Sequence, residues 1–184
     1  IGKAKISLWG GIGIAFEDFR VKDRSLAFDL LQSKRLIVIA KILPLSKKEI
    51  KWRRIVLERP TFHLLRDKNG RFNFFDAPLT KDELRISQKK MIQTLSTLFG
   101  GSLTIRDGVL SFSDESLGDS PLLTEIQSFS LRLSKVSHSK PFPFRASGKI
   151  IHSKKEGKFS MSGTIENIPE DMDLSKGKVK AQVE

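Results

Sequence analysis

Cysteine and tyrosine are both absent from this 184-residue chain. Without cysteine the fold can contain neither a disulfide nor a thiolate metal site. This suits a compartment where free thiols are a liability, although small cytosolic domains often lack cysteine too. No run approaches the roughly 18 uninterrupted apolar residues of a membrane-spanning helix. Because the chain begins with Ile1 rather than methionine, we expect an internal piece of a longer protein, with any signal or anchor before it.

The usual signatures of catalysis are missing as well. The three histidines, His63, His138 and His152, lie in separate segments without metal-ligand spacing or a nucleophile motif nearby. The glycine-rich segment 10–13 lacks the strand–GxGxxG–helix context of a dinucleotide site. We therefore expect no enzyme activity, no cofactor and no metal.

Positive charge is in large excess, with a net charge of +12 and 14 Lys and Arg against 6 Asp and Glu in residues 1–60. A basic surface of this size attracts nucleic acid or anionic lipid head groups, or is simply a solvated face with no specific partner. Nucleic acid is disfavoured because the aromatic residues fall on apolar strand faces and no recognition helix is indicated.

Alternation of apolar and polar residues is the dominant pattern, and it predicts many one-sided β-strands. It is clear in residues 3–8, 12–16, 129–133, 142–150, 159–165 and 179–183, and 36–39 is a short β-branched run. Residues 50–65 are predicted to form one long strand or two collinear ones. Pro60 lies at the joint, where its missing N–H favours an edge or a bulge.

Two turns are predicted from local chemistry. Lys68-Asn69-Gly70 suits a three-residue hairpin loop with Gly70 left-handed, supported by hydrogen bonds of Asp67 and Asn69. In LTIRDGVLSF, Asp107-Gly108 predicts a two-residue type I′ hairpin that pairs residue 105 with 110 and 103 with 112.

One helix is predicted, in segment 79–100, where Thr80 and Glu83 have capping-box spacing and an apolar stripe follows. About ten one-sided strands present more apolar surface than this helix can cover. The sheet must therefore close, pack on a second sheet, or leave a trough for an apolar guest. Of these we favour a mainly β fold: an elongated, curved antiparallel sheet that forms an apolar groove, with one amphipathic helix.

The candidate groove residues are the large apolar side chains on the inward strand positions. They are Phe62, Leu64, Phe72, Phe74, Leu103, Ile105, Leu110, Phe112, Phe129, Leu131, Phe144, Phe159 and Met161. Arg66 and Arg71 flank the first turn, either as solvated turn residues or as contacts for lipid phosphates.

Several motifs together resemble the N-terminal region of the AsmA-like family of bacterial envelope proteins. They are the opening strand IGKAKISL, the segment GIAFEDFRV, the Leu43-Pro44-Leu45 turn, the run from Arg59-Pro60 through Arg66-Asp67 and Gly70-Arg71 to Asn73-Phe74, and LTIRDGVLSFSD. The resemblance covers most of residues 1–165. The segment 25–34 departs from it, being longer than the family's usual approach to the next strand.

The resemblance implies a periplasmic protein, anchored in the inner membrane by an N-terminal helix and related to bridge-like lipid transfer proteins. It would hold and pass phospholipid along the groove, supporting outer-membrane lipid homeostasis and assembly. The chain would divide into an N-terminal AsmA-like β unit (1–78), the helix or linker (79–100) and the start of a repeating β-groove (101–184). The alternative function is a scaffold or assembly factor for outer-membrane proteins that acts by strand addition.

Overall fold

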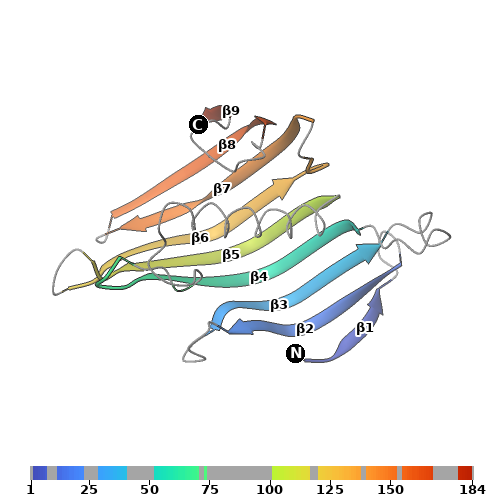
Figure 1. Ribbon diagram of the computed structural model, residues 1–184, viewed down its shortest axis with the longest axis horizontal. Coiled ribbons are helices and arrows are strands. Elements are labelled where there is room, and N and C mark those ends of the chain that lie inside the picture. The colour runs from blue at the N-terminus through green and yellow to red at the C-terminus, as the bar shows by residue number, and fades with distance from the viewer. Residues whose placement is uncertain are drawn as a thin grey trace.

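The computed structural model describes residues 2–7, 12–22, 29–40, 52–70, 73, 101–116, 120–137, 140–152, 155–167 and 178–183. Within these ranges the chain forms nine strands and no helix. The strands make one open sheet in which sequence order and spatial order coincide (Figure 1). The predicted mainly β, open-sheet fold is confirmed, whereas the helix predicted in 79–100 lies outside the described residues. The strands are β1 (Ala4–Ser7), β2 (Gly13–Lys22), β3 (Asp29–Ala40), β4 (Trp52–Arg66), β5 (Ser102–Asp114), β6 (Leu122–Leu133), β7 (Phe142–His152), β8 (Lys155–Asn167) and β9 (Lys178–Val183).

The sheet is antiparallel at every interface except one. Strands β4 and β5 run parallel, with Ile55 beside Leu103 and Arg66 beside Asp114. The fully antiparallel sheet predicted from the sequence is therefore wrong at this interface. Because β4 and β5 are hydrogen-bonded to each other, a single sheet contains strands from both of the β units predicted from the sequence (1–78 and 101–184).

The predicted hairpin at Asp107-Gly108 is wrong. Residues 102–114 form the single strand β5, which pairs with β4 along both of its halves. Only Asp107 is left-handed, with φ of 51°, whereas a type I′ turn needs positive φ at both central residues. The irregularity appears instead as register shifts on both sides of Gly108 in the pairing with β6.

Asp107 belongs to a line of left-handed residues that crosses the sheet. Asp18 on β2, Arg59 on β4 and Ser128 on β6 each have φ of 49°. Arg59 and Asp107 lie side by side, because the preceding residues Glu58 and Arg106 are register partners. The pairing then resumes at Thr61 and Val109. We call Asp18, Arg59, Asp107 and Ser128 the left-handed row.

The left-handed row changes which residues share a face. Strand β7 pairs with β8 without a register shift, so Ala146 and Ile150, four residues apart, lie on the same face. Their partners on β6 are Leu131 and Ile126, which are five residues apart and would face opposite ways in a regular strand. Ser128 lies between them, and its left-handed backbone turns the strand so that Leu131 and Ile126 point to the same face. The same spacing of five recurs on β4 and β5.

Pro60 is explained by this arrangement. It lies in β4, an internal strand, rather than at the edge that the sequence analysis considered. Its ring is almost fully buried, and a side chain on Gly108 would lie 3.1 Å from its Cγ. Beside it, the Ser33 hydroxyl donates to the Glu58 carbonyl at 3.1 Å. Arg59-Pro60 therefore interrupts the strand alternation at a place where the neighbouring strands also change phase.

The turn after β4 is fastened by Asn73. Its side-chain Oδ1 accepts from the Leu65 N–H at 3.0 Å and its Nδ2 donates to the His63 carbonyl at 2.8 Å. Its backbone N–H donates to the Leu65 carbonyl at 3.0 Å, which is the register predicted for a three-residue loop. Gly70 has φ of 76°, and Asp67 Oδ1 accepts from the Asn69 N–H at 2.9 Å, as the turn chemistry indicates.

Replacing Asn73 should loosen this end of β4. Asn73→Ala leaves the Leu65 N–H and the His63 carbonyl without their side-chain partners, so we expect a loss of about 1–3 kcal/mol in the free energy of unfolding. Urea denaturation followed by circular dichroism measures it. Asn69→Ala, in the same turn but with an exposed side chain, is the control and should change stability by less than about 0.5 kcal/mol.

Candidate functional site

One face of the sheet carries unbroken rows of apolar residues. Residues paired across successive strands lie on the same face, so the pairing register lists each row directly. The first row is Ile6, Ile14, Val38, Ile55, Leu103, Leu133, Phe144 and Gly163, and the second is Ala4, Phe16, Leu36, Leu57, Ile105, Leu131, Ala146 and Met161.

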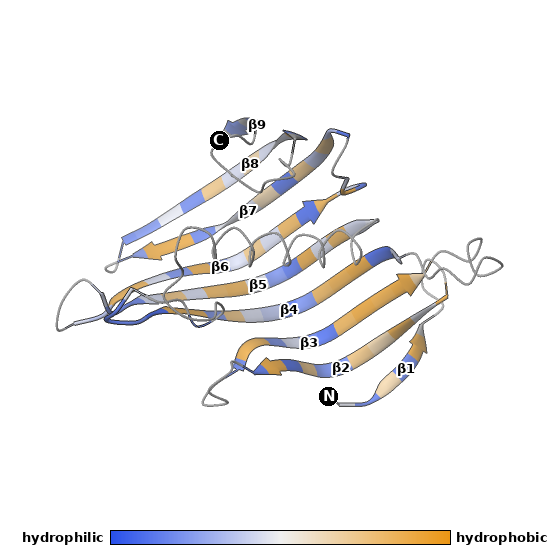
Figure 2. Cartoon of the chain, in the orientation of Figure 1, coloured by the Kyte–Doolittle hydropathy of each residue, from blue (hydrophilic) through white to orange (hydrophobic). Residues whose placement is uncertain are grey.

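A third row lies beyond the left-handed row on the same face. It runs through Val21, Leu31, Phe62, Leu110, Ile126 and Ile150. On β9, Ala181 and Val183 continue the registers of the first two rows. No row contains a charged residue. We call this side, defined by the three rows, the apolar face; Figure 2 shows the alternation of hydrophobic and hydrophilic residues along the strands.

Burial varies along the apolar face. Its centre is covered, with Ile55 and Leu57 9% exposed and Ile105 7% exposed. The β1–β2 end is open, because Ile6 is 80% exposed and Ile14 is 48% exposed. On β6 to β8 burial is mixed: Ala146 is buried, Leu131, Phe144 and Met161 are half-buried, and Ile150 is exposed. The face is therefore not sealed by the sheet itself at either flank.

The predicted groove residues that the structure describes all lie on this face. Besides the members of the rows, Leu64 and Phe112 are paired two residues beyond Phe62 and Leu110. Phe129 pairs with Gly108, and Phe159 pairs with Gly148. A Cβ on Gly148 would lie 3.0 Å from both Ile126 Cγ2 and Phe159 Cε1, so these side chains meet over it. Phe72 and Phe74 lie outside the described residues.

Part of the apolar face was not predicted from the sequence. Phe16, Leu36, Val38, Ile55 and Leu57 belong to the rows but were not singled out. Their strands are apolar on both sides near this end, since Ala15, Ile37, Ile39 and Val56 form a buried cluster on the opposite face. Alternation therefore carried no information in the run 36–39. Only the pairing register identifies which residues of the run join the rows.

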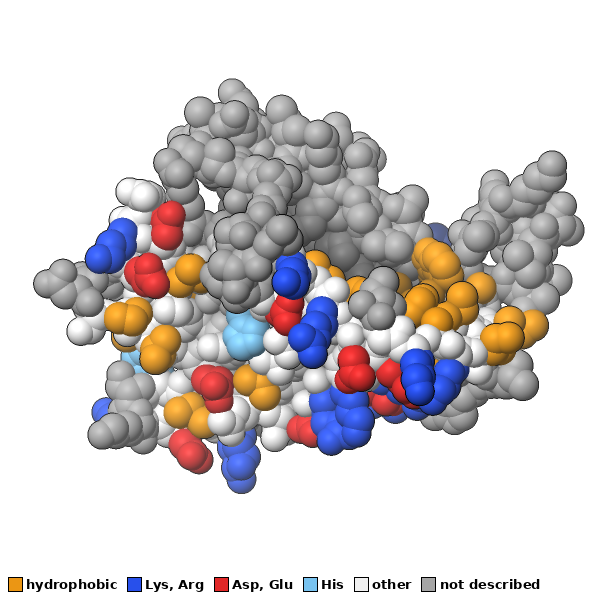
Figure 3. All heavy atoms as spheres, turned by 90° about the horizontal axis from the view of Figure 1, so that it is seen from below, with side chains coloured by type: hydrophobic (Ala, Val, Ile, Leu, Met, Phe, Trp, Pro, Cys, Tyr) orange, Lys and Arg blue, Asp and Glu red, His pale blue; other side chains and the backbone are white. Residues whose placement is uncertain are grey.

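Outside this buried cluster the opposite side of the sheet is polar, and we call it the polar face. Across its first five strands, acids and bases alternate: Lys5 meets Glu17 at 2.7 Å, and Glu58 meets Arg35 at 4.0 Å and Arg106 at 3.5 Å. The hydrogen bond from Lys5 lowers the pKa of Glu17. Figure 3, viewed toward the β1 edge, shows acidic and basic side chains mixed together, with hydrophobic ones toward both ends of the view.

Arg66, one of the two arginines considered for head-group contacts, is paired within the sheet. Its guanidinium lies 3.3 Å from Asp114 Oδ2, and the two residues are register partners at the ends of β4 and β5. Asp114 Oδ1 also accepts from the Ser116 hydroxyl at 2.6 Å and the Ser116 N–H at 2.9 Å. Arg71 lies outside the described residues. The geometry gives Arg66 a role in holding the parallel pair together.

Asp114 should make folding sensitive to acid. The Ser116 hydroxyl, the Ser116 N–H and Arg66 lower the pKa of Asp114 against the opposing effect of burial. A carboxyl with a lowered pKa in the folded state stabilises the fold above its unfolded pKa of about 3.9, and this contribution is lost as pH falls through the folded value. We expect Asp114→Asn to be less stable than the parent at pH 7, with the difference shrinking below about pH 4. Thermal melts from pH 2.5 to 7 measure it; a difference independent of pH contradicts this role.

The histidines form no site in the part of the chain that is described. His152 Nδ1 lies 2.9 Å from the Thr124 hydroxyl, and His63 lies within β4. His138 is outside the described residues. Among the residues that were placed, no three His, Cys, Asp or Glu side chains are arranged to hold a metal. None of the described segments forms a helix long and apolar enough to cross a membrane.

Comparison with known proteins adds no assignment. No family model matches the chain, and no curated protein matches it.

Proposed function

We propose that this protein holds phospholipid by its acyl chains on the apolar face and lets it pass along the rows. The observation that carries the proposal is the absence of charge from two rows that each run through the first eight strands, with β9 continuing their register. Apolar surface left open at the β1–β2 end favours an apolar guest, because exposed contiguous patches mark binding sites.

The dimensions favour a path over a single pocket. Nine strands about 4.8 Å apart make rows about 38 Å long. A bilayer's hydrocarbon core is about 30 Å thick, so one acyl chain spans about 15 Å of it. Each of the first two rows is thus longer than two acyl chains placed end to end in the row direction.

The chemistry of the rows favours movement over tight storage. Burying about 200 Å2 of apolar surface would stabilise a bound chain by about 5 kcal/mol, before the cost of ordering it. No side chain in the rows offers a charged group that would fix the lipid at one place. A guest held this way can slide from one strand to the next at little cost.

The resemblance to the AsmA-like family fits this proposal. On that basis the full-length protein would be anchored in the inner membrane, extend into the periplasm and support outer-membrane lipid homeostasis and assembly. It would be a carrier and not an enzyme, and its ligand would be phospholipid or another acyl-chain lipid. These assignments are the part of the proposal that the resemblance contributes.

Native mass spectrometry and a transfer assay test the function. Protein purified without detergent is expected to carry phospholipid masses, and to move fluorescent phospholipid between liposomes. Protein that carries no lipid and transfers none contradicts the proposal.

The open sheet also favours a second candidate, assembly of envelope proteins by strand addition. Within the described sheet β1 and β9 each pair on one side only, and edge strands of this kind can accept another chain. Under this alternative, a charged residue in the rows would alter stability without affecting any lipid content. Lipid content of the variants described in the Discussion separates the two functions.

A further inference from the structure

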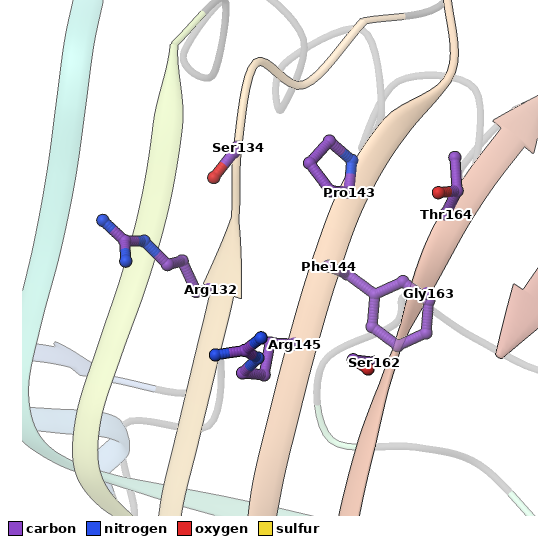
Figure 4. A pocket seen from close by; sticks show the side chains of 8 residues that line it. All are labelled: Arg132, Ser134, Pro143, Phe144, Arg145, Ser162, Gly163 and Thr164. Atoms are coloured by element: carbon purple, nitrogen blue, oxygen red, sulfur yellow. The ribbon is translucent and has the colours of Figure 1, made fainter. Parts of the chain in front are cut away.

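A cationic hollow lies on the polar face, on the side of the sheet away from the apolar rows. It has a volume of about 470 Å3 and spans β6 to β8. Strand alternation places six of its lining side chains on the polar face: Arg132, Ser134, Pro143, Arg145, Ser162 and Thr164. Phe144 and Gly163, which lie between them in sequence, complete the lining (Figure 4).

Two arginines are direct cross-strand partners in this hollow. Arg132 on β6 pairs with Arg145 on β7, so their Cβ atoms are about 5 Å apart. Like charges placed directly opposite each other destabilise a sheet. Figure 4 shows both side chains extending toward the β5 side of the hollow. An anion between them would turn this repulsion into attraction.

The first five strands of the polar face are arranged differently. On β3 to β5, Arg35 and Arg106 share Glu58. In the described part of the sheet no carboxylate is ion-paired with Arg132 or Arg145. Their neighbours in the same row are Thr104 on β5 and Ser162 on β8, which bring hydroxyls and no negative charge. Among the described residues no negative charge balances the two arginines, and an anionic ligand would supply one.

The structure points to a phosphate-binding site formed by Arg132 and Arg145, and we propose it as a second binding site on this protein. Guanidinium groups bind phosphate oxygens through paired N–H donors, and hydroxyls can donate to the remaining oxygens. Ser134, Ser162 and Thr164 supply these hydroxyls around the hollow. The phosphate can arrive as a free phosphate or as the head group of an anionic lipid, since the recognised chemistry is the same.

Paired substitutions test the site against simple attraction of anions. Arg132→Gln with Arg145→Gln removes two charges and also relieves the repulsion between them, so the fold should be retained. Lys149→Gln with Lys158→Gln is the matched control. These lysines are also direct partners on β7 and β8 of the polar face, but do not line the hollow. Thermal melts check that all variants remain folded.

Two ligands are titrated at about 150 mM salt, where long-range attraction is largely screened. Binding of inorganic phosphate is measured from changes in the protein's amide chemical shifts. Binding to vesicles of phosphatidylcholine, with or without phosphatidylglycerol, is measured by co-sedimentation. We expect the arginine pair variant to bind phosphate, or the phosphatidylglycerol vesicles, at least tenfold more weakly. The lysine pair variant should differ less than twofold from the parent.

The titration that is weakened in the arginine pair variant identifies the source of the phosphate. Loss of phosphate binding assigns a soluble phosphate ligand, whereas loss of vesicle binding alone assigns a lipid head group. If neither arm depends on the arginine pair, or if both pairs matter equally, the site is refuted. The phospholipid content of the apolar face, measured by native mass spectrometry, should be the same in all variants, so this proposal and the lipid-carrying function can fail separately.

Discussion

Met161→Glu is expected to lower the phospholipid content of the protein at least tenfold. Met161 lies in the second apolar row, between Ala146 and the register position of Val183. A methionine contributes about 1.5–3 kcal/mol when its apolar surface is buried, and each 1.4 kcal/mol is a factor of ten in affinity. A carboxylate at this place removes that contribution and adds the cost of desolvating a charge beside an acyl chain.

The adjacent residue provides the control. Ser160 is next along β8 on the polar face, so Ser160→Glu adds the same charge on the other side of the sheet. It should leave lipid content within twofold of the parent. Ile14→Glu keeps the test valid if Met161→Glu folds poorly, since Ile14 is on the apolar face but is already 48% exposed. Equal lipid content in all three variants contradicts lipid binding by the rows.

Gly101→Ala is expected to destabilise the protein by about 3 kcal/mol or more. Gly101 is buried immediately before β5, and a Cβ there would overlap the backbone carbonyl of Arg53 and lie 2.8 Å from the carbonyl of Trp52. Backbone cannot move aside as the end of a flexible side chain can. The clash is created by the parallel entry of β5 beside β4, the feature that the sequence did not reveal.

Gly157→Ala separates this clash from a general effect of alanine. Gly157 lies in β8, is exposed, and has no atom within 4 Å of the added Cβ. The change should be neutral, or stabilise by up to about 1 kcal/mol, because alanine restricts the unfolded chain. Chemical denaturation measures both variants. A Gly101→Ala protein as stable as Gly157→Ala contradicts the close approach of β4 and β5.

Alternation predicted the strands and their apolar sides where one face of the sheet is polar. Phe144 and Ala146, or Phe159 and Met161, were placed on one face from the sequence, and the register agrees. Alternation was uninformative in the run 36–39, where both faces of the sheet are apolar. Strand β3 begins at Asp29, well before that run. The residues in between show no clear alternation, so the first half of β3 was not predicted.

Asp107-Gly108 shows why the remainder could not be predicted. A left-handed Asp followed by Gly suits a tight hairpin and an interrupted strand equally well on local grounds. The choice is made by β4, which offers partners to both halves of β5. Such partners are distant in sequence, and with them come the parallel pairing, the left-handed row and the pairing of Arg66 with Asp114.

The position of bound acyl chains is the most direct test of the central claim, that the charge-free rows form the lipid path. The protein is loaded with a phospholipid that carries a photoreactive group on its acyl chain, irradiated, and the labelled residues are mapped by mass spectrometry. We expect adducts on the apolar face, for example at Ile14, Leu131 and Met161, and none at Arg106 or Ser160 on the polar face. Labels spread equally over both faces, or no labels in protein that remains folded, would contradict the account.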